Sequence, residues 1–181
     1  MTFLRDLPER AALLDVFRKY PKTAVPLIEF HEVLMRGDSP LSIAERELIA
    51  AYVSGLNACD YCHGVHAVTA EAFGMDEAVL KALLNDIETA PIDAKLKPIL
   101  RYVHKLTTMP VRLTSADAEA VFAAGWNDKA LHDAISVCAL FNFMNRLVEG
   151  IGITAKTDYF RLSGERLHQG GYAGLLKLLD Q

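Results

Sequence analysis

The chain of 181 residues is the size of about one domain and is long enough to bury a hydrophobic core. Lys and Arg total 19 against 23 Asp and Glu, a formal charge of −4, and no basic tract is present that follows a phosphate backbone, so we expect no nucleic-acid partner. Hydrophobic residues make up 51% and charged residues 23%, as in globular proteins, and no apolar run reaches the roughly 18 residues that span a bilayer, so we expect no membrane partner.

The N-terminal segment does not have the pattern of a secretory signal. Charged residues such as Arg5, Asp6 and Arg10 interrupt its apolar stretches, and it lacks a small-residue cleavage site. We therefore expect a cytoplasmic protein, in which cysteines stay reduced.

Apolar residues recur with a spacing close to 3.6 along almost the whole chain, and no alternating pattern typical of a strand is present. The predicted helices run from about Pro8 to Tyr20, Val25 to Arg36, Ser42 to Leu56, Ala58 to Phe73, Asp76 to Asn85, Asp93 to Met109, Ser115 to Ala124 and Asn127 to Glu149, and a last helix starts near Tyr172. Short breaks that contain Gly or Pro separate them, and none is a flexible linker. We predict an all-α fold, a compact multi-helix bundle that forms a single domain over residues 1–181.

The helix predicted from Ser42 begins with a recognisable cap. Ser42 and Glu45 have the spacing of a capping box, in which the Glu45 carboxylate accepts a hydrogen bond from the Ser42 amide. Residues 48–56, LIAAYVSGL, carry no charge on any face, which is typical of a helix that is buried all round. Glu47 lies one residue before this segment, and we interpret it either as a solvated first-turn carboxylate or as a functional group.

The helix predicted from Asn127 is also strongly apolar, and Cys138 lies within it, so we expect an inert core thiol. Asn142, Asn145 and Arg146 interrupt the apolar run, and we expect a buried polar network or a subunit contact there. The remaining isolated histidines lack the spacing of metal ligands, so we interpret them as structural or surface residues: His31, His104, His132 and His168.

The clearest chemical signal is the segment CDYCHGVH, residues 59–66. Asn57 is predicted to cap the next helix, which places Cys59 and Cys62 in its first turn and a half. Residues three apart on a helix lie about 5–6 Å apart, within the reach of a disulfide, and Cys62 shares a face with His66. A neighbouring base and the positive end of a helix both favour the thiolate, which is the reactive form of cysteine.

Four kinds of site fit parts of this segment. The string C-x-x-C-H is also that of c-type haem attachment, but that chemistry occurs on exported chains. A structural zinc site would use Cys59, Cys62 and His66, yet it needs a fourth ligand and the chain has no second cysteine pair. A thioredoxin-like site would follow a strand, and no strand is predicted before Asn57. A redox pair on an all-helical scaffold fits every feature, and His63 is then interpreted as a surface residue.

The order and spacing of these residues resemble a known family. Glu47 is followed after eleven residues by Cys59, and then by Cys62 and His66. This register is similar to the alkylhydroperoxidase D-like (AhpD-like) core of the carboxymuconolactone decarboxylase superfamily, and more narrowly to its peroxidase-related branch. The strong match covers about residues 38–75, and the supporting stretches are SPLS at 39–42, ERE at 45–47, FNFMNR at 141–146 and GIG at 150–152.

The resemblance implies an all-α, oligomeric antioxidant enzyme that reduces organic or hydrogen peroxides with its cysteine pair, and without haem, flavin or metal. By position, Cys62 resembles the peroxidatic cysteine, Cys59 the resolving cysteine, His66 the base and Glu47 the carboxylate that passes the proton onward. The chain departs from the best-known members at Tyr61, where those members carry a second histidine between the cysteines.

The chemistry of the residues agrees with attack by Cys62. The helix dipole acts most strongly on Cys59, but such effects are typically about 0.3–1 kcal/mol. A positioned base such as His66 contributes more to Cys62, because it also removes the proton during attack. Cys62 then becomes a sulfenic acid that condenses with Cys59 to a disulfide.

A dithiol electron donor of the lipoyl or thioredoxin type is expected to reduce that disulfide. Two alternatives stay open: a thiol-disulfide oxidoreductase with little peroxide activity, and a non-enzymatic helical protein whose cysteines and His66 hold zinc. We also expect a homo-oligomer, because a chain with 51% hydrophobic residues has more apolar helix surface than one small domain readily hides.

Overall fold

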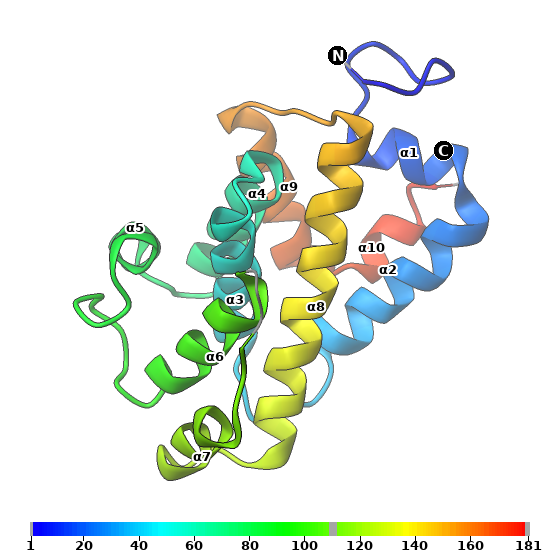
Figure 1. Ribbon diagram of the computed structural model, residues 1–181. Helices are drawn as coiled ribbons and strands as arrows, with labels where there is room; N and C mark the ends of the chain where they lie inside the picture. The colour runs from blue at the N-terminus through cyan, green and yellow to red at the C-terminus, as the bar shows by residue number, and fades with distance from the viewer. Residues whose placement is uncertain (1, 109–111, 180–181) are drawn as a thin grey trace.

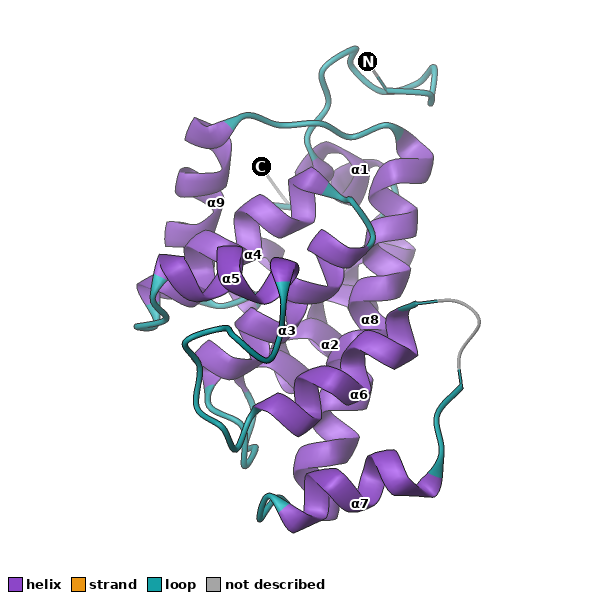
Figure 2. Ribbon diagram, turned by 60° about the vertical axis from the view of Figure 1, so that its left-hand side comes forward, coloured by secondary structure: helices purple, strands orange, loops and turns teal. Residues whose placement is uncertain are grey.

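The computed structural model describes residues 2–108 and 112–179, and these residues form helices and no strand, which confirms the all-α prediction (Figure 2). The helices are α1 (Leu13–Lys19), α2 (Pro21–Arg36), α3 (Ile43–Leu56), α4 (Asp60–Ala72), α5 (Glu77–Asn85), α6 (Lys97–Thr107), α7 (Ser115–Ala123), α8 (Asp128–Ile151), α9 (Thr157–Gly170) and α10 (Ala173–Leu176).

The helices are arranged around α8, which runs through the middle of the molecule (Figure 1). Figure 1 shows α1 and α2 on one side of α8 and α3, α4 and α6 on the other. Helix α3 packs against both α4 and α8, and α4 packs in turn against α9. The last helix, α10, returns to pack against α2 and α9.

Helix α3 forms as its sequence predicts. Ser42 Oγ accepts from the Glu45 amide at 3.2 Å, and the Glu45 carboxylate accepts from the Ser42 amide at 2.7 Å, which confirms the capping box. Every residue from Leu48 to Ser54 is buried, because neighbouring helices cover this charge-free segment on all sides. The helix therefore holds Glu47 inside the protein.

Helix α9 was not among the predicted helices. Its sequence, TDYFRLSGERLHQG, mixes charged residues with glycine and has only a narrow apolar face. The apolar periodicity of this segment is too weak to predict a helix, and packing against α4 stabilises it instead. Two glycines let the two helices approach closely. A Cβ on Gly164 would lie 2.6 Å from Val68 Cγ1, and one on Gly64 would lie 2.4 Å from the Phe160 ring.

Several helix boundaries differ from the prediction, including the starts of α1, α2 and α6 and the end of α6. The first helix starts at Leu13 rather than near Pro8, because the Asp15 carboxylate accepts from the Ala12 amide at 2.8 Å and fixes the start there. The helix predicted to end at Met109 ends at Thr107 in α6, and the predicted end lies outside the described residues.

The turn between α3 and α4 also differs from the prediction. Asn57 ends α3 instead of capping α4, and Ala58 takes a left-handed conformation with φ of 53°. This turn makes Cys59 the N-cap of α4 and places Cys62 in the first turn of the helix. The side chain of Asn57 is engaged elsewhere, since its Nδ2 donates to Asn145 Oδ1 at 2.9 Å and to Asn142 Oδ1 at 3.1 Å.

Helix α8 is the one helix in the described part of the chain that is long and apolar enough, by length and composition, to cross a membrane. Half of its most apolar stretch is buried against other helices. The core helix of a globular protein has the same properties.

Candidate active site

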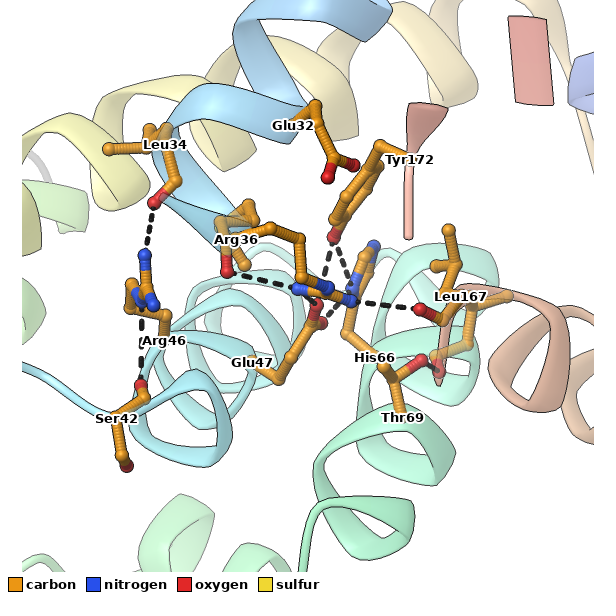
Figure 3. A network of polar contacts seen from close by, with 12 residues as sticks. Glu32, Leu34, Arg36, Ser42, Arg46, Glu47, His66, Thr69, Leu167 and Tyr172 are labelled. Carbon is orange, nitrogen blue, oxygen red and sulfur yellow. Dashed lines mark hydrogen bonds and ion pairs between the residues drawn. The ribbon is translucent and has the colours of Figure 1, made fainter. Parts of the chain in front are cut away.

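Glu47 and His66 form a buried pair between α3 and α4 (Figure 3). Glu47 is 0% exposed, so its interpretation as a solvated first-turn carboxylate is wrong. Its Oε2 accepts from His66 Nδ1 at 2.7 Å. Its Oε1 accepts from Arg36 Nη1 at 2.7 Å and from the Tyr172 hydroxyl at 3.1 Å. The carboxylate is thus held by groups from α2, α4 and the segment that precedes α10.

The environment keeps the Glu47 carboxylate ionised. Burial by itself raises the pKa of Glu47, but the charge and hydrogen bonds of His66 and Arg36 outweigh it and hold that pKa below its ordinary value. A carboxylate only accepts hydrogen bonds, so His66 Nδ1 carries the hydrogen. In the neutral tautomer that this hydrogen bond selects, the other ring nitrogen, Nε2, carries the lone pair that accepts a proton.

Arg36 and Tyr172 are functional candidates that the sequence did not reveal. Arg36 also donates to the Leu167 carbonyl oxygen at 3.2 Å, and its guanidinium carbon lies 4.9 Å from the centre of the Tyr172 ring. Both residues reach Glu47 from segments distant in sequence, and no local pattern marks either. Figure 3 shows Arg36, Tyr172 and His66 converging on the Glu47 carboxylate.

Cys59 and Cys62 are both free thiols and both buried, at 0% and 3% exposed. The S–H of Cys62 donates to the Cys59 sulfur, and this hydrogen bond lowers the pKa of Cys59 against the opposing effects of burial and of the Glu149 carboxylate. The same hydrogen bond, together with burial, raises the pKa of Cys62 well above its ordinary value. In the resting state the first thiolate is therefore favoured on Cys59.

A cavity of about 80 Å³ opens beside this pair. Cys62 and His66 both line it, whereas Cys59 does not. Most of its wall is apolar, with contributions from Ile28, Val65 and Phe141. A small molecule in the cavity therefore contacts Cys62 and His66 together and does not contact Cys59.

The neighbours of the cysteine pair have structural partners. The Tyr61 hydroxyl hydrogen-bonds to the Tyr159 hydroxyl on α9 at 2.7 Å, and burial raises the pKa of Tyr61 well above its ordinary value. His63 differs from the prediction of a surface residue, because it is half-buried and its Nδ1 donates to the Ala51 carbonyl oxygen at 2.9 Å. Tyr61 therefore connects α4 to α9, and His63 connects α4 to α3.

The buried polar network expected at the polar residues of α8 is confirmed only in part, since Asn145 is buried, Asn142 is half-buried and Arg146 is exposed. Asn145 Nδ2 donates to Ser54 Oγ at 2.9 Å, and Asn145 also hydrogen-bonds to the Cys62 sulfur and lowers the pKa of that thiol. Arg146 is exposed and donates to the backbone and side-chain oxygens of Asn142 at 2.7 and 2.9 Å.

Cys138 lies in the core, as predicted. It is 0% exposed, its sulfur lies 3.3 Å from Thr107 Oγ1, and burial raises its pKa. A buried thiol with a raised pKa is a poor nucleophile.

The isolated histidines have different surroundings. His132 is exposed, His168 packs edge-on against the Phe73 ring, and His104 Nδ1 lies 2.8 Å from the Tyr52 hydroxyl. His31 is buried, which agrees with a structural role, and it also lines the cavity with Cys62 and His66.

In the described ranges, no group of three or more His, Cys, Asp and Glu is arranged to hold a metal ion. Cys59, Cys62 and His66 are therefore not arranged as the ligands of a zinc ion in the described residues.

Comparisons with known proteins show which family and which solved structures the chain is similar to. The carboxymuconolactone decarboxylase family matches residues 21–102, a range that includes Glu47, Cys59, Cys62 and His66. An uncharacterized peroxidase-related protein from Silicibacter sp. TM1040 is 28% identical, with a TM-score of 0.75, over 82% of this chain and 78% of that chain.

A second similar structure is an uncharacterized peroxidase-related protein from Ralstonia eutropha JMP134, described as an alkylhydroperoxidase AhpD core. It is 25% identical, with a TM-score of 0.75, over 83% of this chain and 78% of that chain. A search of curated proteins finds no match to the sequence.

Proposed function

This chain belongs to the AhpD-like part of the carboxymuconolactone decarboxylase superfamily, and on that basis we propose that it is a cysteine-based peroxidase that reduces organic or hydrogen peroxides. The observation that carries the proposal is the cavity that Cys62 and His66 line together, with His66 held by the buried Glu47. A nucleophile, a base and a residue that orients the base are the parts that such a reaction needs.

In the first step, His66 Nε2 takes the proton of Cys62 and the thiolate attacks the terminal oxygen of the peroxide. A sulfur–oxygen bond forms, the oxygen–oxygen bond breaks, and the leaving alkoxide takes the proton back from His66. Cys62 is thereby oxidised to a sulfenic acid, and the peroxide is reduced to an alcohol or to water. Glu47 stabilises the protonated imidazole while it carries the proton.

In the second step, the Cys59 sulfur attacks the Cys62 sulfenic acid, a disulfide forms and water leaves. A dithiol donor of the lipoyl or thioredoxin type then reduces the disulfide by thiol-disulfide exchange. The donor and a cytoplasmic location belong to the proposal, as does an antioxidant role.

Cys62 is the attacking residue in this proposal although Cys59 has the lower pKa. Cys59 does not line the cavity, so a peroxide bound there does not reach it. Access to the peroxide therefore decides the assignment.

The test is a count of free thiols before and after one equivalent of peroxide. The wild type is expected to lose the thiols of Cys59 and Cys62 and to keep that of Cys138. Cys62→Ser is expected to consume no peroxide, and Cys59→Ser to stop after one turnover with a sulfenic acid on Cys62 that a dimedone probe captures.

Cys138→Ser is the control variant and should behave as the wild type. Labelling of Cys59 by the probe in Cys62→Ser would reverse the assignment of the two cysteines. The wild type could instead reduce a disulfide substrate rapidly and consume no peroxide, and this result would favour the thiol-disulfide oxidoreductase. The lowered pKa of Cys59 supports that alternative, because it favours the thiolate.

A further inference from the structure

Arg166, Ser163 and His31 are polar residues that line the cavity and have no part in the reaction described so far, and two of them carry an inference about the ligand. Ser163 on α9 and His31 on α2 line the same cavity as Cys62 and His66. Ser163 is 8% exposed, and its buried Oγ has no hydrogen-bond partner among the described residues. Buried hydroxyls nearly always have a partner, because an unsatisfied one costs free energy. An unpartnered hydroxyl in the wall of a cavity therefore indicates that a ligand supplies the partner.

The His31 ring presents a hydrogen-bond acceptor. Its Nδ1 lies 2.7 Å from the Leu27 carbonyl oxygen. A carbonyl oxygen only accepts, so Nδ1 carries the hydrogen and Nε2 has a free lone pair. Burial lowers the pKa of His31 to about 4, so the ring stays neutral near neutral pH. Because Nδ1 is bonded to the backbone, Nε2 is the ring nitrogen that is available to a ligand in the cavity.

The size and lining of the cavity limit the ligand. A water molecule takes about 10–15 Å³ of such a volume, so about 80 Å³ holds a molecule of roughly six non-hydrogen atoms. The walls are mostly apolar, with side chains such as Phe17, Ile28 and Met144. The cavity thus fits a small, largely apolar molecule with one group that both donates and accepts a hydrogen bond.

We propose that His31 and Ser163 bind the hydroperoxy group of a small alkyl hydroperoxide and present its terminal oxygen to Cys62. This inference rests on the proposed function. The peroxide O–H donates to His31 Nε2, and the Ser163 hydroxyl donates to the oxygen that is bonded to carbon. When Cys62 attacks, negative charge develops on that second oxygen, so the hydrogen bond from Ser163 strengthens as the oxygen–oxygen bond breaks.

The test compares single-turnover oxidation of Cys62 by tert-butyl hydroperoxide, which is of this size, in the wild type and in Ser163→Ala and His31→Leu. Each variant is expected to raise the half-saturating peroxide concentration about tenfold, the typical effect of one lost hydrogen bond. The rate and pH profile of Cys62 alkylation should stay unchanged, because His66 and Glu47 are intact.

Two further variants separate binding from structure. His31→Gln is expected to recover most of the affinity, since its amide oxygen extends to the position of Nε2 and accepts a hydrogen bond. Ser115→Ala, at an exposed serine in α7, is the matched control and should behave as the wild type. Ser163→Ala should not lower the thermal midpoint, because it removes a hydroxyl without a partner.

A second measurement needs no peroxide chemistry. The product analogue tert-butanol is expected to protect Cys62 from iodoacetamide in the wild type, and to do so about tenfold less well in Ser163→Ala and His31→Leu. A wild type that consumes no peroxide while this pattern holds would overturn the proposed peroxidase but keep the binding site. The binding site would be overturned if tert-butanol protected Cys62 equally well, and the half-saturating peroxide concentration were equal, in the wild type and all variants. It would also be overturned if the pH profile of Cys62 alkylation changed together with the oxidation of Cys62.

Discussion

His31 has a lowered pKa, and burial is the main cause. Its pKa is lowered to about 4 in the folded protein, against 6.5 for an exposed histidine, because the ring is buried. Between these two values the unfolded chain binds a proton that the folded protein does not. The free energy of unfolding therefore falls as the pH is lowered from 6.5 to 4.

We expect this residue to contribute a loss of about 3 kcal/mol over that range, from 1.36 kcal/mol for each pH unit. His31→Gln should remove this part of the pH dependence, whatever it does to stability at pH 7. Urea unfolding at pH 7 and pH 4.5 measures the difference, and His132→Gln, at an exposed position, is the control. If the free energy of unfolding of His31→Gln fell with pH as steeply as that of the wild type, the ring would take up a proton equally well in the folded and the unfolded protein.

Glu47 and His66 are expected to act as one proton-handling unit. Replacement of His66 by Ala or of Glu47 by Gln should slow peroxide attack about 10²–10⁴-fold, the usual contribution of a general base. The double variant should be no slower than the poorer single variant, because the two groups share one task. Stopped-flow oxidation and the pH profile of Cys62 alkylation measure both effects.

Glu45→Gln is the control for this pair, since Glu45 only closes the capping box at the surface of α3. It should change the stability little, because Gln closes a capping box as Glu does, and it should keep the peroxide rate. If Glu45→Gln slowed the reaction and Glu47→Gln did not, the buried pair would have no role in proton transfer.

At the level of the elements, the close approach of α4 and α9 brings Ser163 and Tyr159 to the site, and glycine makes it possible. Gly164→Ala is expected to destabilise the protein by about 1–3 kcal/mol, because its Cβ would lie 2.6 Å from Val68 Cγ1 and 3.2 Å from the Thr69 amide nitrogen. Gly150→Ala in α8 should instead be neutral or stabilising by up to about 1 kcal/mol, because no atom lies within 4 Å of the added Cβ.

Urea unfolding of both variants tests this contrast. A Gly164→Ala variant as stable as Gly150→Ala would show that α9 shifts away from α4 at little cost.

At the level of the whole molecule, the chain leaves large apolar side chains on its surface. Tyr20, Phe30 and Phe143 are 43%, 49% and 52% exposed, and they border one apolar groove of about 720 Å³ beside α1, α2 and α8. We expect a second copy of the chain to cover this groove, because contiguous apolar surface of this kind is costly to leave in water.

Light scattering at micromolar concentration should give a mass above the 20.0 kDa of one chain. A Phe30→Glu, Phe143→Glu double variant should shift the mass toward that value, whereas Leu162→Glu, exposed on α9, should not. A monomeric wild type would contradict the prediction.

The sequence by itself determined the features that depend on local spacing. The 3.6-residue period predicted the helices, the charge-free run placed α3 in the core, and the capping box placed its start. The register of Glu47, Cys59, Cys62 and His66 predicted which residues lie together, because two adjacent helices joined by a short turn present them to each other.

Only the tertiary structure decided which distant groups complete the site. Arg36, Tyr172, His31 and Ser163 come from α2, α9 and the segment before α10, and Tyr172 is 125 residues from the carboxylate it contacts. Periodicity records which face of a helix is buried but not which other helix covers it. For the same reason α9 was missed: its position depends on two glycines that let it approach α4, and this contact forms only when the helices pack.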